Sequence, residues 1–117
     1  MREVDLVVRT KKFALRVIKL VDALPNTLVG RTIGGQLIRS GTSVSANYRA
    51  AGRGRSKAEF IAKLGIVEEE ADESCHWLEI IIETKLMDER LVIDLLREAN
   101  EITAIMAASK RTARNKK

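Results

Sequence analysis

The sequence has few of the residues that disulfides, metal centres and stacking surfaces require. Its 117 residues include one cysteine, one histidine and one proline. The aromatic residues are Trp77, Tyr48 and two phenylalanines. A single cysteine, Cys75, cannot form a disulfide within the chain, and the one proline, Pro25, forces few chain breaks. Strand-rich folds with many turns are therefore disfavoured, and the sequence predicts an all-α domain with one core.

Long apolar stretches are also missing. The sequence contains no run of 18 or more apolar residues and no charged leader followed by an apolar segment. We therefore expect a soluble cytoplasmic protein that has no contact with a membrane.

Charge is distributed unevenly along the chain. Residues 1–57 contain 12 basic and 3 acidic residues (net +9), and residues 58–109 contain 4 and 13 (net −9). Residues 110–117 contain 5 basic and no acidic residues (net +5). The two long segments should attract each other when they pack, and we expect residues 110–117 to form a basic tail that meets water or an acidic partner such as nucleic acid.

Apolar residues recur at spacings of three and four over four segments, which predicts four helices within one bundle domain, residues 1–109. The expected helices span about 6–24, 30–53, 57–86 and 89–109. Short connections near Pro25, Gly54 and Asp88 favour an antiparallel up-and-down four-helix bundle.

Polar residues at the expected helix starts are predicted caps. Asp5 and Asp88 precede the first and fourth apolar patterns, and Ser56 with Glu59 has the spacing of a capping box.

The second predicted helix has small and polar residues in its centre. Gly41 stands on its apolar stripe where a large side chain is expected, which would let a neighbouring helix approach closely at a cost of roughly 1 kcal/mol. Polar residues also follow one line of this helix and could pair with the acidic third helix. This predicted structural polar layer comprises Gln36, Ser40, Ser43, Asn47, Glu69 and Glu73.

Two stretches, residues 80–82 and 91–96, are apolar around more of the helix than one bundle core can cover. A second buried face accounts for this surplus, so we expect a homo-oligomer.

Candidate catalytic and metal-binding groups are sparse. Glu73 and His76 lie one helical turn apart, as in di-iron bundles, but a complete site would need residues from several subunits because the chain has one histidine. The alternative is a partly exposed histidine beside Trp77. Cys75 and His76 point about 100° apart on one helix and do not form a nucleophile–base pair. The sequence thus indicates no catalytic residue, no cofactor and no small-molecule substrate.

Basic residues on and after the second helix, together with the C-terminal ones, could neutralise a nucleic-acid backbone. The alternative is that they pair with the acidic third helix or with an adjoining subunit. The candidate nucleic-acid-binding residues are Arg39, Arg49, Arg53, Arg55, Lys57, Lys110, Arg111 and Arg114.

The segment QLIRSGTSVSANYRAAGRGRSKAEFIAKLGIVEEEADES, residues 36–74, followed by HWLE at 76–79, resembles the signature of the bacterial four-helix bundle proteins encoded in 23S ribosomal RNA intervening sequences. The resemblance implies a bundle that assembles into a homopentameric ring and has no catalytic activity. It also implies kinship with a retroelement accessory protein that binds a reverse transcriptase and nucleic acid through its basic surface.

Residues and resemblance together predict a non-enzymatic oligomeric bundle that binds RNA or a ribonucleoprotein through basic surface. Two alternatives stay open: a protein-binding scaffold with no nucleic-acid role, and a metal-binding bundle that uses Glu73 and His76 across subunits.

Overall fold

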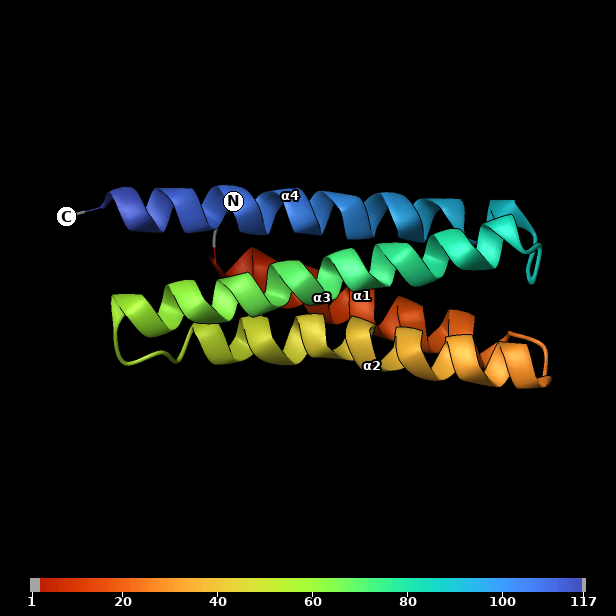
Figure 1. The fold of residues 1–117 in the computed structure, drawn as a ribbon. Coiled ribbons are helices and arrows are strands. Elements are labelled where there is room, and N and C mark those ends of the chain that lie inside the picture. Colours follow the sequence, from red (N-terminus) through yellow and green to blue (C-terminus); the bar gives the residue numbers. More distant parts are fainter. Residues whose placement is uncertain (1–2, 117) are drawn as a thin grey trace.

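The computed structural model of the protein describes residues 3–116, with side chains from Leu6 onward. These residues form helices and no strands, so the all-α prediction is confirmed. Figure 1 shows that the four long helices run alternately up and down. The elements are α1 (Glu3–Asp22), α2 (Leu28–Ala51), α3 (Lys57–Glu83), the 3-10 turn η1 (Glu89–Leu91) and α4 (Ile93–Asn115). None of these helices is both long enough and apolar enough to cross a membrane.

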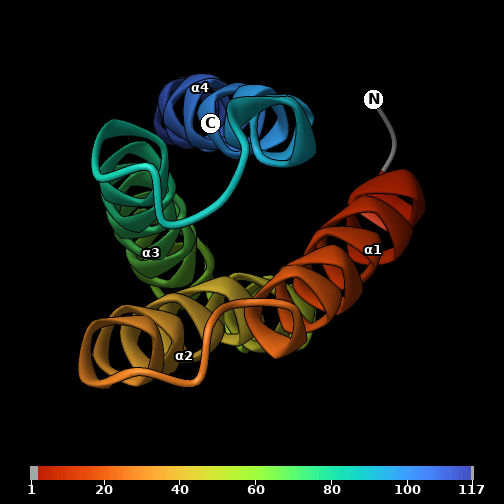
Figure 2. The same cartoon turned by 90° about the vertical axis from the view of Figure 1, so that its right-hand side faces the viewer.

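The helices pack as an open arc about 50 Å long and 20 Å across. In Figure 2, α1 and α4 lie at the two ends of this arc, with α2 and α3 between them. Consecutive helices pack along their length, whereas α1 and α4 contact each other over a short stretch. There Arg9 of α1 donates from Nε and Nη2 to the two carboxylate oxygens of Glu98 on α4, at 2.8 and 2.7 Å. This bidentate ion pair joins the ends of the arc.

Side-chain caps start α2 and α3. The hydroxyl of Thr27 accepts from the Gly30 amide at 3.0 Å, so α2 begins two residues before the predicted start. Ser56 caps α3 as predicted, since its hydroxyl accepts from the Glu59 amide at 3.1 Å. The carboxylate of Glu59 accepts from the Arg55 amide at 2.6 Å, one residue before the capping-box position.

The other two predicted caps act differently. Asp88 accepts from the Arg90 amide at 2.9 Å, but it caps η1, and α4 begins only at Ile93. Asp5 lies inside α1, which begins at Glu3, and its side chain is outside the described part of the chain.

The third helix ends at Glu83, three residues before the predicted end. Lys85 adopts a left-handed conformation with φ of 58°. The Leu86 amide donates to the Ile81 carbonyl at 3.1 Å, and the Lys85 amide donates to the Ile82 carbonyl at 3.0 Å. This is a Schellman ending in which lysine occupies the position that glycine usually takes.

The fourth helix continues to Asn115, so the predicted tail at 110–117 is helical through that residue. The last carbonyls of α4 have a cationic partner, because the Lys57 ammonium donates to the carbonyl of Arg114 at 3.4 Å and to that of Lys116. A cation at a helix C-terminus stabilises the helix, which explains why the basic sequence does not fray from residue 110.

Glycine brings α1 and α2 close together. A Cβ atom on Gly41 would lie 2.8 Å from both Cγ atoms of Val17, and one on Gly34 would lie 3.1 Å from Cγ1 of Val21. These two glycines are seven residues apart on the face of α2 that meets α1. The predicted role of Gly41 is thus confirmed: glycine occupies this core position because Val17 of α1 fills the space beside it.

The apolar residues of 80–82 and 91–96, which we expected to face other subunits, lie mostly inside the chain's own core. Ile81, Val92 and Leu95 are buried, and Ile80, Ile82 and Leu96 pack against the core. In this region only Leu91 is a strongly exposed large apolar residue, at 68%. These residues are therefore no evidence for a second buried face: α3 packs against both α2 and α4, and Val92 and Leu95 at the start of α4 are part of the same core, so the homo-oligomer stays a prediction.

We expect Gly41→Ala to lower the free energy of unfolding by about 1–3 kcal/mol, because the new methyl group overlaps a stiff, buried valine. Gly35→Ala is the matched control, since a Cβ atom there meets no atom within 4 Å. That variant should gain about 0.5–1 kcal/mol from helix propensity. Urea unfolding measures both, and equal effects at the two positions would contradict the close approach.

Candidate nucleic-acid interface

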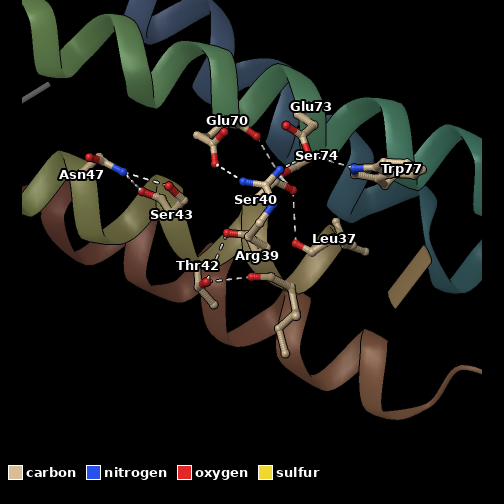
Figure 3. A network of polar contacts seen from close by, with 11 residues as sticks. Leu37, Arg39, Ser40, Thr42, Ser43, Asn47, Glu70, Glu73, Ser74 and Trp77 are labelled. Carbon is tan, nitrogen blue, oxygen red and sulfur yellow. Dashed lines mark hydrogen bonds and ion pairs between the residues drawn. The ribbon is translucent and has the colours of Figure 1, made fainter. Parts of the chain in front are cut away.

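A buried hydroxyl pair links α2 to α3. Ser40 and Ser74 are fully buried, and their Oγ atoms lie 2.9 Å apart (Figure 3). Ser74 donates to the Glu70 carbonyl at 2.9 Å, and the Ser40 hydroxyl also lies 3.2 Å from the Leu37 carbonyl. Sequence reasoning identified Ser40 but missed Ser74. The signal was present, because Ser74 lies on the same stripe of α3 as Ala71 and Leu78.

Next to this pair, Arg39 of α2 binds the acidic face of α3. Its Nη1 donates to Glu70 at 3.1 Å and its Nη2 donates to Glu73 (Figure 3). The indole N–H of Trp77 donates to the same oxygen of Glu73 at 3.1 Å. The hydrogen bond from Trp77, together with that from Arg39, holds the pKa of Glu73 below its ordinary value.

The predicted polar layer is therefore only partly present. Gln36 and Glu69 are exposed at the surface. Asn47 donates to the hydroxyl of Ser43 at 2.8 Å and to its carbonyl at 3.0 Å, so this pair stays within α2. The four α2 positions lie within about 60° of one another around the helix, at the border of its buried face, and only Ser40, which is turned furthest inward, is fully buried.

The predicted metal pair does not converge. The Glu73 carboxylate is bound by Arg39 and Trp77, whereas His76 is exposed, with its ring edge against Trp77 at a centroid distance of 4.8 Å. Across the described residues, no group of three or more histidine, cysteine, aspartate or glutamate side chains could hold a metal ion.

Cys75 is a core residue. Its thiol is buried and lies 3.5 Å from the side-chain oxygen of Asn100. Burial raises the pKa of this thiol to about 11, so it stays protonated at neutral pH and is a poor nucleophile.

Three of the eight candidate nucleic-acid-binding residues are engaged inside the chain. Arg39 pairs with α3 as described above, and Lys110 of α4 pairs with Glu68 of α3 at 2.6 Å. Lys57 donates to the C-terminal carbonyls of α4. These cations lie within reach of acidic groups or helix carbonyls because α3 packs between α2 and α4, so we remove them from the candidate interface.

The five remaining cations form what we call the basic end. Figure 1 shows that the α2–α3 connection and the end of α4 lie at the same end of the bundle. All five side chains are exposed, and none of them forms an ion pair with a carboxylate among the side chains described, residues 6–116. The basic end comprises Arg49, Arg53, Arg55, Arg111 and Arg114.

Part of the basic end lines a groove. Arg53, Arg55 and Lys63 border a hollow of about 330 Å³ between the end of α2 and the first turns of α3. Glu59 also lies there, but its carboxylate accepts a hydrogen bond from the Arg55 amide. The hollow therefore presents three cationic side chains to one carboxylate, which suits an anionic ligand.

The geometry defines a class: a small antiparallel helical bundle that carries, at one end, five exposed cations with no ion-pair partner among residues 6–116. The family model described as 23S rRNA-intervening sequence protein matches residues 2–108, and the chain belongs to this family. This confirms the resemblance found in residues 36–79.

A crystal structure of a protein of unknown function from the S23 ribosomal protein family of Bacteroides thetaiotaomicron is similar to this chain. The two share 31% sequence identity with a TM-score of 0.87, and the match covers 95% of this chain and 99% of the other. A comparison with curated proteins finds no match.

We expect the charge of Glu73 to make folding sensitive to acid. Its pKa is lower in the folded state than in the unfolded state, so its stabilising contribution is complete above about pH 4.3, the ordinary glutamate value, and is lost as the pH falls through the folded pKa. Glu73→Gln should flatten this part of the stability profile, measured by urea unfolding between about pH 7 and pH 3. Glu69→Gln, an exposed neighbour, should leave the profile unchanged. Identical profiles for the two variants would show that Arg39 and Trp77 do not stabilise the ionised form of Glu73.

Proposed function

We propose that this protein is a non-enzymatic, homo-oligomeric helical bundle that binds RNA through its basic end. The observation that carries the proposal is that Arg49, Arg53 and Arg55 are exposed at one end of the bundle, in a chain whose other cations include several that pair internally. Exposed arginines bind phosphates through paired N–H groups, and release of counterions from the nucleic acid supplies the affinity.

The chemistry of the basic end favours backbone contacts over base recognition. Tyr48 and Phe13 are buried, so these two rings offer no stacking surface, and arginines without such rings beside them are expected to contact phosphate rather than base edges. The description of the family refers to 23S rRNA, which supports RNA as the polyanion. Binding is thus expected to depend steeply on salt and weakly on sequence.

Removing three arginines tests this function. The variant Arg49→Ala, Arg53→Ala, Arg55→Ala should bind a fluorescent single-stranded RNA more weakly, and its salt slope should fall by about 2 per bound subunit, at roughly 0.7 per lost phosphate contact. Fluorescence anisotropy at several salt concentrations measures both quantities.

The control removes the same charge from another face. Lys12, Arg16 and Lys19 are exposed on α1, so their triple alanine variant should keep most of the affinity and slope. Equal losses in the two triple variants would show that the effect comes from net charge alone and would refute a site at the basic end.

An exposed stripe on α1 supports self-association. Val8, Leu15 and Ile18 are 40–57% exposed, and their spacings of seven and three place them on one face. Such a stripe on a small protein is typical of a helix that packs against another subunit. Five copies of the 13.0 kDa chain, as the family resemblance implies, would have a mass of about 65 kDa.

We expect Leu15→Lys to dissociate this assembly to monomers, because a charge in the centre of an apolar contact has no partner there. Leu91→Lys, at an exposed leucine away from the α1 stripe, should keep the wild-type mass. Light scattering measures the mass of each variant. A monomeric wild-type protein, or the same mass for all three, would contradict an interface on α1.

A further inference from the structure

A cavity of about 850 Å³ opens at the same end of the bundle as the arginines. It lies between the α2–α3 connection, the first turn of α3, the last turns of α4 and the start of α1. Its apolar lining includes Leu6, Tyr48, Phe60 and Ile105, one from each of the four helices. The cavity is thus an open groove whose floor continues the core at this end of the bundle.

The cavity exists because the four helices do not overlap completely. Figure 1 shows that the start of α3 and the end of α4 extend past the first turn of α1. On α4, the inward stripe that is buried at Ile102 and Met106 continues with Ser109 and Ala113, which line the cavity instead of packing against α1. Among the described residues, the position that a neighbouring helix would occupy beside this part of α4 is therefore open.

The shape of the opening suits a helix. Along α4 the lining runs from Ile105 to Ala113, which is about 12 Å at 1.5 Å per residue, or just over two turns. Its wall on α4 consists of small side chains such as Ala108, Ser109 and Ala113. Small residues let a second helix approach to about 8 Å, whereas the apolar floor can take the larger side chains of that helix.

The charge around the opening selects the chemistry of the partner. Lys116 lines the cavity, as does Lys57, which also donates to the last carbonyls of α4, and no aspartate or glutamate is among the described lining residues. Arg114 lies within the same last turn of α4. A helix that buried an apolar face here would place its flanking residues beside cations, so glutamate and aspartate on its flanks would be favoured.

We infer that this cavity binds the apolar face of an acidic amphipathic helix from a partner protein. The apolar floor distinguishes the cavity from the arginine surface proposed for RNA, since a phosphate backbone gains nothing from contact with leucine and isoleucine. This mode of recognition places one helix in a groove, with apolar anchors at spacings of three and four and with charge setting the orientation. The inference goes beyond RNA binding and does not depend on it.

A synthetic peptide tests the inference. The probe is a fluorescent amphipathic helix with leucine on one face and glutamate on its flanks, and the control peptide carries lysine in place of every glutamate. We expect the acidic peptide to bind at least about tenfold more tightly than the basic one, as measured by anisotropy. Equal binding of the two peptides, or no binding of the acidic one, would overturn the inference.

Two variants of α4 locate the site. Ala113→Trp fills the cavity and should weaken binding of the acidic peptide at least about tenfold. Ala104→Trp places the same side chain on an exposed part of α4 and should leave binding unchanged. If the two variants bind alike, the peptide lies elsewhere and the inference is wrong.

Because Ala113→Trp can disturb the fold, amide NMR shifts of the unmodified protein give a second test. The peptide must shift the signals of Ser109, Thr112 and Gly54, and shifts confined to other residues would overturn the inference.

Other occupants give distinct results. If Ala113→Trp abolishes RNA binding, the cavity belongs to the RNA site, and if it lowers the oligomer mass, a second copy of the chain fills the cavity. Either result overturns the inference. RNA affinity that falls only in the triple arginine variant, with peptide affinity that falls only in Ala113→Trp, would support both proposals separately.

Discussion

The close approach of α1 and α2 at Gly41 is the constraint on which the rest of the bundle depends. Because Val17 fills the space that a side chain at this position would need, α2 can contain a poor helix former at its centre and still be held by packing. The next residue toward the N-terminus, Ser40, points to α3 and meets Ser74. Two interfaces are therefore anchored within one turn of α2, which sits between α1 and α3 in the arc.

Charge pairing inside the bundle decides which cations remain for a partner. The basic first half and the acidic second half meet at Arg9 with Glu98 and at Arg39 with Glu70 and Glu73. These arginines lie where an acidic helix runs alongside. The arginines around the α2–α3 connection have no acidic side chain of α3 or α4 paired with them in the described chain. They form the surface to which we assign RNA.

Sequence patterns predicted the helices well and the ends of the helices less well. The Ser56 cap and the glycine at position 41 follow from local chemistry, and both are present. The end of α3 was predicted too late because lysine, not glycine, takes the left-handed position at residue 85. The helical end of α4 was missed because its stabilising partner, Lys57, is distant in sequence. Apolar residues 80–82 and 91–96 were assigned to another subunit because sequence periodicity does not show that α3 is covered on two sides, or that the start of α4 packs into the same core.

The sequence by itself determined the all-helical class, the order of the helices, the opposite charge of the two halves and the family, because these properties depend on the spacing and identity of neighbouring residues. Only the tertiary structure decided that Ser40 meets Ser74, that Arg39 and Lys110 are internal partners, and that α1 leaves the cavity beside Ile105 and Ala113 open. The reason is physical: hydrogen bonds, ion pairs and cavities depend on the distances between helices, and those distances follow from how the side chains of all four pack together.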